Sequence, residues 1–496
     1  MNHFLKNKIY KGNFSIVMLL SGIMLLGAIL RTVDLSSKSF WGDELLSLFH
    51  SQDIHNIKSF FSSLWGNFHP PLYFLLLKFW SVFGNSEFHL RLLSVIFGVA
   101  VIPATYLLGI QLFEKKVSLL GAFFVAVSPF HLLYDREVRM YGLLTLLSIL
   151  SLYFFLRALR EGKNKLWVVY TALTVLNTYT HYHAFLVIIF QWIFFLLRFK
   201  CYKNQLKKMA ISQLAIALCF AFWLPVFLTQ LRAPSLDSSD RIPFVFFGYI
   251  IKPLYVFFSF SFGQTILPWN LLVIPGVLIA LTAFILGVKK LILHQEARDF
   301  VLFYLFIPLI AGTAMSLAMP RYYIFISPVY LLLLAFGLFC FSNRVIRLGI
   351  ILALLLILAV PLKNYYLNNE FHILAHVDPF REVGEYLKTN VKEGDLFVNI
   401  GGSYSIRYYS NNITESGLNF KETLAQKKYN RIWILIADTK FKDEGENAVK
   451  WLDEHYKRIL EKKYYRDPDY AMKKRLFRKN FLEYRIKVYL YIPKTV

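Results

Sequence analysis

The chain has 496 residues, of which 56% are hydrophobic, 18% are aromatic and only 17% are charged. Because soluble domains carry about 25% charged residues, this composition excludes an ordinary soluble enzyme and indicates a protein embedded in a membrane. The formal net charge of +24 would suggest a nucleic-acid partner in a soluble protein. Here much of the excess lies in short loops between apolar segments, and no basic stripe accompanies a nucleic-acid-binding fold. We expect the membrane, and no nucleic acid, as a partner.

The apolar residues come in segments of about 17 to 25 residues, the length that crosses about 30 Å of hydrocarbon. The first segment follows Lys6, Lys8 and Lys11 but precedes no small-residue cleavage site, so it is predicted to be a span and not a removable signal. Placing the basic loops in the cytoplasm predicts about eleven transmembrane helices. They lie near residues 14–31, 90–112, 117–134, 141–157, 166–180, 184–198, 209–231, 268–288, 299–318, 322–341 and 346–363.

Two further apolar stretches, 71–83 and 244–262, are interrupted by Lys78 and by Gly248, Lys252 and Pro253. They are predicted to be helices lying at the outer membrane surface. An odd number of crossings then places the N-terminus in the cytoplasm and the tail outside. Residues 1–363 form the all-α polytopic membrane domain in this prediction.

Residues 364–496 are more polar than the rest of the chain. Amphipathic helices are predicted at 383–390 and 447–455, and short strands at 395–400, 431–437 and 485–492. The sequence therefore predicts a small C-terminal α/β extracytoplasmic domain.

The loops expected on the outer face bring together carboxylates, histidines, arginines and tyrosines from distant parts of the sequence. Charge at a membrane boundary is ordinary, but mixed-sign clusters from five loops indicate a site. Asp135 lies in one of these loops and is kept as an alternative carboxylate. The candidate site residues are Trp41, Asp43, Glu44, His69, Arg91, Arg139, Tyr141, His181, Arg321 and Tyr322.

Each candidate also has a purely structural interpretation. Asp43 precedes an apolar run and could cap a surface helix, and His69 before Pro70 could mark a helix start. The arginines could be boundary residues whose charged ends reach the interface, and the tyrosines fit an aromatic belt. The histidines near residue 181 could satisfy loop backbone, an interpretation favoured for His183. The joint occurrence of these residues supports a functional site.

Two sequence runs, SFWGDE at 39–44 and FHPPLY at 68–73, resemble motifs of the GT-C superfamily of membrane glycosyltransferases. The pattern continues at 83–94, 128–141 and 321–328, so the resemblance covers roughly residues 15–340. The nearest branches are the protein O-mannosyltransferases and the bacterial enzymes that modify lipopolysaccharide with aminoarabinose or galacturonic acid. The resemblance implies a GT-C fold and a transfer of sugar, outside the cytoplasm, from a polyprenyl-phosphate donor to a lipid, glycan or protein acceptor of the cell envelope.

The acidic pair of the first exterior loop marks the superfamily and falls on Asp43 and Glu44, which the resemblance implies are catalytic. This chain has His69-Pro70-Pro71 where aminoarabinose transferases carry Glu-Lys-Pro. The departure removes a lysine that could hold the lipid phosphate, so the arginines Arg91, Arg139 and Arg321, with His69 in support, are assigned that role. Trp41, Tyr141, His181 and Tyr322 are assigned to substrate binding. The chemistry needs no ATP-binding apparatus, because the activated lipid carries its own leaving group. No cofactor is assigned, and the departure leaves open whether a divalent metal takes part.

Elementary chemistry agrees with this assignment. Displacing a lipid phosphate needs a base for the acceptor hydroxyl and positive groups where charge builds on the leaving phosphate, and arginine suits phosphate geometry. The alternatives are a transporter or flippase and a polymerase or ligase of lipid-linked sugars. A transporter would place ionisable residues near the bilayer midplane, whereas these spans are nearly free of charge.

The basic-loop pattern gives a direct test of topology. A reporter that is active only outside the cytoplasm, fused after Val496, should be active because the tail follows an odd number of crossings. Activity of a cytoplasmic reporter alone at the same position would overturn both the topology and the exterior site.

Overall fold

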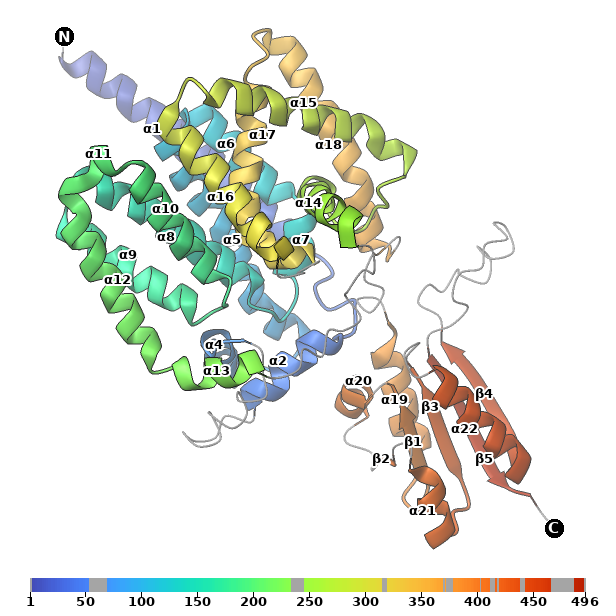
Figure 1. Ribbon diagram of the computed structural model, residues 1–496. Coiled ribbons are helices and arrows are strands. Elements are labelled where there is room, and N and C mark those ends of the chain that lie inside the picture. Colours follow the sequence, from blue (N-terminus) through green and yellow to red (C-terminus); the bar gives the residue numbers. More distant parts are fainter. Residues whose placement is uncertain are drawn as a thin grey trace. The chain divides into compact units, whose positions relative to one another are not determined.

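The structure is a computed structural model that describes residues 2–52, 69–232, 245–314, 319–368, 371, 378–401, 403–410, 415–416, 419–437, 442–464 and 486–494. It divides into two compact units (Figure 1). The helical unit contains Met1–Leu35 and Ser47–Tyr366, and the α/β unit contains Ser36–Leu46 and Leu367–Val496. The sequence did not predict that a segment of the first loop would group with the tail.

The helical unit is built from apolar helices joined by short turns. Its main elements are α1 (Asn2–Thr32), α4 (Leu72–Trp80), α5 (Glu87–Leu112), α6 (Lys115–Val127), α7 (Pro129–Asp135), α8 (Tyr141–Glu161), α9 (Asn164–Thr178), α10 (Ala184–Leu197), α11 (Phe199–Tyr202), α12 (Leu206–Ala221), α13 (Leu224–Arg232), α14 (Val245–Phe262), α15 (Ile274–Leu291), α16 (Gln295–Ala314), the 3₁₀ helix η5 (Pro320–Ile326), α17 (Ser327–Leu338) and α18 (Arg344–Tyr366). The helix α2 (Gly42–Gln52) runs across the boundary between the two units.

Length and apolarity make this a multi-pass membrane protein. Among the described residues, six helices are long and apolar enough to cross a membrane, or up to eight if each of two bent helix pairs is one span. The bent pairs are α6 with α7, at 55°, and α10 with the helices up to Ala221, at 86°. The prediction of about eleven crossings stays a prediction, because several predicted spans, such as α9 with its 15 residues, are short or bent helices. The end of the predicted span 299–318, at 315–318, lies outside the described residues.

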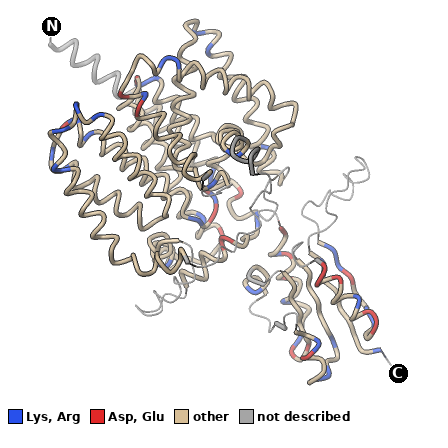
Figure 2. The backbone as a smooth tube through the Cα atoms, viewed as in Figure 1, with Lys and Arg blue, Asp and Glu red and all other residues tan. Residues whose placement is uncertain are grey.

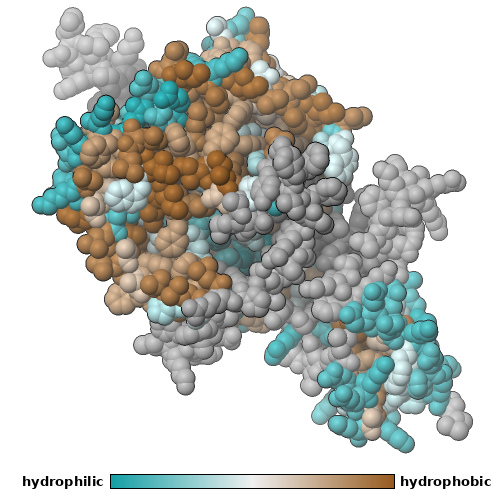
Figure 3. All heavy atoms as spheres, in the orientation of Figure 1, coloured by the Kyte–Doolittle hydropathy of each residue, from teal (hydrophilic) through white to brown (hydrophobic). Residues whose placement is uncertain are grey.

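The two stretches predicted to lie at the membrane surface form short apolar helices. Leu72–Phe83 would extend only about 18 Å at 1.5 Å per residue, and α14 carries Pro253 within the helix. Figure 3 shows a broad hydrophobic face on the helical unit. Figure 2 shows that charged residues of this unit lie mostly near helix ends, so that long stretches of helix between them carry no charge.

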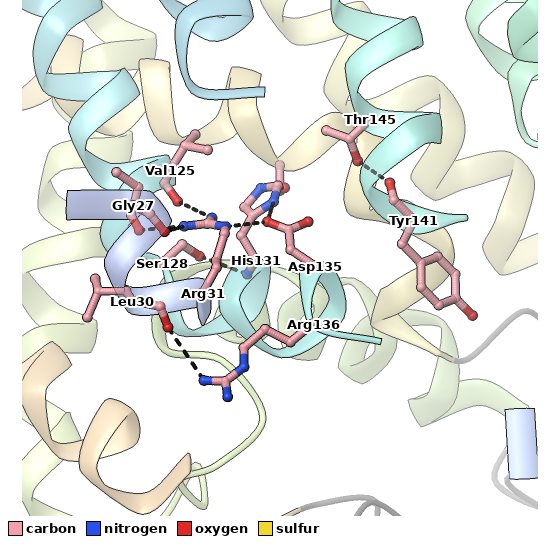
Figure 4. Close-up of polar contacts among 12 residues, drawn as sticks. Gly27, Leu30, Arg31, Val125, Ser128, His131, Asp135, Arg136, Tyr141 and Thr145 are labelled. Carbon is pink, nitrogen blue, oxygen red and sulfur yellow. Dashed lines mark hydrogen bonds and ion pairs between the residues drawn. The ribbon is translucent and has the colours of Figure 1, made fainter. Parts of the chain in front are cut away.

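A buried ion pair connects three helices of the helical unit. Arg31, at the end of α1, donates from Nε to Oδ2 of Asp135 at 2.9 Å, and both side chains are fully buried. The same guanidinium donates to the carbonyls of Gly27, Ala126 and Val125 at 2.9–3.1 Å. Figure 4 shows Arg31 reaching between these groups, with His131 beside the carboxylate. The pair thus joins α1 to the bend between α6 and α7.

This pair corrects the sequence prediction for Asp135. The sequence placed Asp135 in an exterior loop as an alternative carboxylate for the site, but the structure places it inside the unit and in contact with Arg31. Gly98 and Gly142 make room for it, since a Cβ on Gly98 would lie 2.3 Å from the Asp135 carboxyl carbon. Asp135 is therefore a structural residue. Sequence analysis missed its partner because Arg31 reads as an ordinary charge at a helix end.

The α/β unit is a five-stranded sheet in the order β2-β1-β3-β5-β4. Its strands are β1 (Leu396–Ile400), β2 (Glu415–Ser416), β3 (Ile432–Ile436), β4 (Tyr456–Tyr464) and β5 (Ile486–Pro493). β1 pairs in parallel with β2 and β3, whereas β5 pairs antiparallel with β3 and β4. Three strands, β1, β3 and β5, nearly coincide with those predicted from the sequence.

Side chains of alternate strand residues pack on opposite faces of this sheet. On one face, Phe397 and Trp433 pack with Val383 and Leu387 of α19 (Phe380–Asn390) and with Ile406 of α20 (Ser403–Tyr409). On the other face, the core includes residues of α21 (Phe420–Gln426) and α22 (Lys442–His455). Helices α19 and α20 lie unusually close, because a Cβ on Gly384 would meet the Tyr409 Cβ at 2.3 Å.

The buried ion pair gives a stability prediction. Asp135→Ala should lower the free energy of unfolding by about 3–5 kcal/mol, because Arg31 would keep a buried charge without its carboxylate. Combining Asp135→Asn with Arg31→Met removes both charges and should restore part of that loss. Thermal unfolding of the purified protein in detergent measures both effects.

The control is Glu161→Ala, which breaks the solvent-facing pair of Glu161 with Arg157. Surface pairs contribute little, so this variant should unfold like the parent. An Asp135→Ala protein as stable as Glu161→Ala would show that the buried pair does not hold the helices together.

Candidate active site

Two arginines and three histidines lie close together in the helical unit. They come from four separate segments: the residues before α4, the loop between α7 and α8, the loop between α9 and α10, and η5. We call this set the arginine–histidine cluster; its members are His69, Arg139, His181, His183 and Arg321. Three of the sequence candidates for phosphate binding and one candidate for substrate binding are thus brought together. Phe68, which precedes His69 in the sequence motif, lies outside the described residues.

Arg139 links the cluster to helix α2. Its Nη1 donates to the Ser47 hydroxyl at 3.1 Å and its Nη2 lies 3.0 Å from Nε2 of His69. Because a guanidinium donates only, Nε2 of His69 is the acceptor and the imidazole proton belongs on Nδ1. That buried Nδ1 has no hydrogen-bond partner among the described residues. His69 thus has a buried N–H donor whose hydrogen bond is not made within the described part of the chain.

The same reasoning fixes the proton of His181. Its Nδ1 accepts the backbone N–H of His183 at 3.1 Å and lies 2.8 Å from Nδ1 of the His183 ring. With Nδ1 as acceptor, the proton of neutral His181 belongs on Nε2, which is buried and has no hydrogen-bond partner in the described part of the chain. The rings of His69 and His181 are 5.0 Å apart. The cluster therefore offers two neighbouring imidazole N–H donors.

Burial and positive neighbours keep these histidines neutral. Burial lowers the pKa of His69 well below its ordinary value, and Arg139, His183 and Arg321 lower it further. The pKa of His181 is lowered by burial and then by His183, His69 and the two arginines, and burial lowers that of His183 to about 4. At neutral pH the positive charge of the cluster is carried by Arg139 and Arg321. Both arginines are buried, where charge acts more strongly on a ligand than it does in water.

Tyrosine rings lie beside both arginines. The Arg139 guanidinium is 5.8 Å from the Tyr141 ring centroid and that of Arg321 is 5.5 Å from Tyr322. His183 stacks on Tyr322 with the rings 5.5 Å apart and 11° from parallel. These contacts are cation–π and stacking interactions that orient the cationic groups. The sequence analysis favoured a role in satisfying loop backbone for His183, but its ring packs within the cluster. Its position two residues after His181 was the sequence feature that could have indicated this.

Arg91 contacts different groups. Its Nη1 donates to the Leu35 carbonyl at 2.9 Å and lies 3.9 Å from the Glu87 carboxylate. Arg136 similarly donates to the carbonyls of Leu30 and Val33. The described contacts of Arg91 thus hold the chain just after α1, and none of them joins Arg91 to the arginine–histidine cluster.

The acidic pair lies at the start of α2, in the part that belongs to the α/β unit. Glu44 is 1% exposed, and its Oε2 accepts the backbone N–H of Trp41 at 3.3 Å. This is the carboxylate half of a capping box, so Glu44 stabilises the helix start. Asp43 is only partly buried. Capping was the structural alternative for Asp43 in the sequence, and the structure adds a capping contact of Glu44 that the sequence analysis did not consider.

Metal binding was left open by the sequence. Among the described residues no group of three or more His, Cys, Asp or Glu side chains could hold a metal ion. The arginine–histidine cluster instead combines guanidinium groups with imidazole N–H donors, a set suited to an anion.

Because these histidines are neutral in the folded protein, we expect the stability of the fold to decrease at acidic pH. Unfolded His69 takes up a proton below about pH 6.5, while the buried ring does not. Stability should therefore fall as the pH drops from 7 to 5, by up to about 1.4 kcal/mol per pH unit for each such histidine. His69→Gln should reduce this fall, as measured by thermal unfolding across that range. His455→Gln changes an exposed histidine at the end of α22 and serves as control; an identical pH dependence of His69→Gln and parent would contradict the assignment.

Comparison with known proteins places this geometry in context. The family model of dolichyl-phosphate-mannose-protein mannosyltransferase matches residues 68–228. No protein of curated function matches the sequence significantly. Among solved structures, apo ArnT of Cupriavidus metallidurans aligns with a TM-score of 0.57 at 12% identity, covering 97% of this chain and 98% of that chain. ArnT bound to undecaprenyl phosphate aligns with a TM-score of 0.55 at 14% identity, covering 96% and 97%.

A second solved protein is the oligosaccharyltransferase AglB of Archaeoglobus fulgidus, in complex with an inhibitory peptide and a dolichol-phosphate. It aligns with a TM-score of 0.54 at 11% identity, covering 91% of this chain and 73% of that chain. At these identities the structural matches establish a shared fold. The chain thus shares the fold of ArnT and AglB, and the family model of dolichyl-phosphate-mannose-protein mannosyltransferase matches part of it, in agreement with the resemblance of the motifs at 39–44 and 68–73.

Proposed function

We propose that the protein transfers a hexosyl or pentosyl group from a polyprenyl-phosphate donor to an acceptor on the outer face of the cytoplasmic membrane. In this proposal the N-terminus is cytoplasmic and residues 364–496 are extracytoplasmic. The observation that carries the proposal is the arginine–histidine cluster, where two buried guanidinium groups lie close to two buried imidazole N–H donors. Such a set of donors favours a phosphate group.

Arg139 and Arg321, supported by His69, hold the donor phosphate. As the bond between the sugar C1 and the phosphate oxygen breaks, its electron pair stays on the phosphate, and buried cations stabilise that charge. His181 adds a second N–H donor. Two solved complexes of the same fold support a lipid phosphate as ligand, since ArnT was solved with undecaprenyl phosphate and AglB with dolichol-phosphate. The described contacts of Arg91 favour an anchoring role for this residue, although its sequence motif suggests phosphate binding.

Asp43 is the catalytic base. It accepts the proton of the acceptor hydroxyl while the oxygen of that hydroxyl forms a bond to C1 of the sugar. The partial exposure of Asp43 favours it over Glu44, whose carboxylate is buried and caps α2. Ser47, which accepts a hydrogen bond from Arg139, follows Asp43 by one turn of the same helix. Trp41, Tyr141 and Tyr322 are assigned to the sugar, and the acceptor is a lipid, a glycan or a protein.

The decisive experiment replaces the base. Membranes containing the parent or the Asp43→Asn protein are incubated with a panel of labelled polyprenyl-phosphate sugars. The parent should transfer label from at least one donor, and Asp43→Asn should be slower by about 10² to 10⁴ because no general base remains. Glu44→Gln is the matched control, since glutamine also serves in a capping box; it should retain most of the activity.

Thermal stability measured on the same purified proteins separates catalysis from folding. Asp43→Asn should unfold like the parent. A stable Asp43→Asn protein with near-normal transfer, beside an inactive Glu44→Gln protein, would reverse the two assignments. Failure of the parent to use any donor of the panel would count against the proposed reaction itself.

A further inference from the structure

The segment Ser36–Leu46, which carries the acidic pair, belongs to the same compact unit as the tail of the chain. Only eleven residues of the first loop join the α/β unit in this way, and they include the motif at 39–44. The contacts between this segment and the tail are specific. They come from two helices, α19 and α20, that lie side by side on one face of the sheet (Figure 1).

Arg381, in the first turn of α19, makes the densest set of contacts. Its backbone N–H donates to the Ser39 hydroxyl at 3.1 Å. Its Nη2 donates to the Ser36 carbonyl at 2.7 Å and to the Lys38 carbonyl at 3.2 Å. Arg381 therefore holds three residues of the loop, two through their backbone carbonyls and one through its side-chain hydroxyl. A lysine at this position would have a single ammonium centre in place of the guanidinium fork.

Tyr409, at the end of α20, holds the residue next to the motif tryptophan. Its hydroxyl oxygen accepts the backbone N–H of Phe40 at 2.7 Å. Phe40 is fully buried and meets the Tyr408 ring edge-on, with centroids 5.6 Å apart. A buried N–H that loses its acceptor is costly, so the Tyr409 hydroxyl favours one position of the loop immediately before Trp41.

The support behind these contacts is rigid. Gly384 of α19 lets α20 approach so closely that any side chain there would collide with Tyr409. Val383, Leu387 and Ile406 anchor the two helices in the core beside the sheet. Arg381 and Tyr409 thus extend from a packed layer, which is the condition for holding another group in a defined place.

We propose that Arg381 and Tyr409 are positioning residues for catalysis: through Ser36, Lys38, Ser39 and Phe40 they fix the start of α2 and with it Asp43. This inference rests on the proposed function, because Asp43 is the base in that proposal. It gives the tail a role in sugar transfer that needs no contact between the tail and the substrate. A displaced base slows the chemical step even when donor binding is intact, and a misplacement of about 1 Å can cost about 10²-fold.

The test uses two conservative substitutions in the full chain. Tyr409→Phe removes the acceptor for the Phe40 N–H but keeps the aromatic ring and the Cβ that lies against Gly384. Arg381→Lys keeps the positive charge but removes the planar guanidinium group. Both should lower kcat and kcat/KM together by about 10-fold to 100-fold while the donor KM stays near that of the parent. An unchanged kcat in both variants would overturn the positioning role.

Matched controls lie in the same unit and do not contact Ser36–Leu46. Tyr491→Phe removes a hydroxyl that bonds Asp453 at 3.0 Å, and Arg431→Lys alters a guanidinium that bonds the Asn390 carbonyl at 2.7 Å. The controls should share any loss of thermal stability with the test variants but keep parental kcat. Controls as slow as the test variants would mean that the tail acts only through its own folding, which also overturns the proposal.

Hydrogen exchange makes the result independent of the reaction. Peptides covering 36–46 should exchange faster in Tyr409→Phe and Arg381→Lys than in the parent and the controls. Unchanged exchange would show that these residues do not hold the loop. If the parent transfers no sugar from any donor, the proposed function and the catalytic part of this inference both fail, while the exchange rates still decide whether the tail fixes the loop.

Discussion

The Arg31–Asp135 ion pair is the interaction on which the helical unit depends. Two fully buried charges 2.9 Å apart are tolerated only when each is paired and hydrogen-bonded. Arg31 satisfies this condition by bonding three backbone carbonyls as well as the carboxylate. Asp135 is the last residue of α7 and Arg31 lies in the last turn of α1 (Figure 4). The pair therefore fixes the end of α1 against the start of the loop after α7. Arg139 of the arginine–histidine cluster lies in that second loop.

Other arginines reinforce the same end of α1. Arg136 donates to the carbonyls of Leu30 and Val33, and Arg91 donates to that of Leu35. The last carbonyls of a helix have no intrahelical partner, so guanidinium groups satisfy them and define the direction in which the chain leaves. The arginines of this unit therefore divide into those that hold backbone, such as Arg31, Arg91 and Arg136, and those of the cluster, Arg139 and Arg321. A charge count along the sequence does not separate the two groups.

The positive charge of the cluster lies on its two arginines, because its histidines are neutral. Burial and the two guanidinium groups lower the pKa of His69 and His181, so these rings act as N–H donors and add no further repulsion. The acidic pair is divided in a comparable way: Glu44 caps the helix and Asp43 stays partly accessible. The two adjacent carboxylates thus differ in their surroundings. Arg381 and Tyr409 of the tail add hydrogen bonds to the loop that carries these two acids.

The sequence by itself determined that this is a multi-pass membrane protein, and it predicted several elements of the tail. Apolar segment length revealed membrane helices, and the motifs at 39–44 and 68–73 indicated the GT-C superfamily, because both signals are local in the sequence. The three strands β1, β3 and β5 were predicted for the same reason, since alternating apolar residues need no distant partner to be recognised.

Only the tertiary structure decided which charges meet. Asp135 turned from a candidate loop carboxylate into the partner of Arg31, 104 residues away, and Arg91 donates a hydrogen bond to the Leu35 carbonyl. His183 joined the cluster, and Ser36–Leu46 joined the tail through Arg381 and Tyr409, more than 300 residues away in sequence. These outcomes depend on burial and on packing between distant segments, which set the partners and the pKa of a side chain. Residue type and spacing carry no information about either quantity.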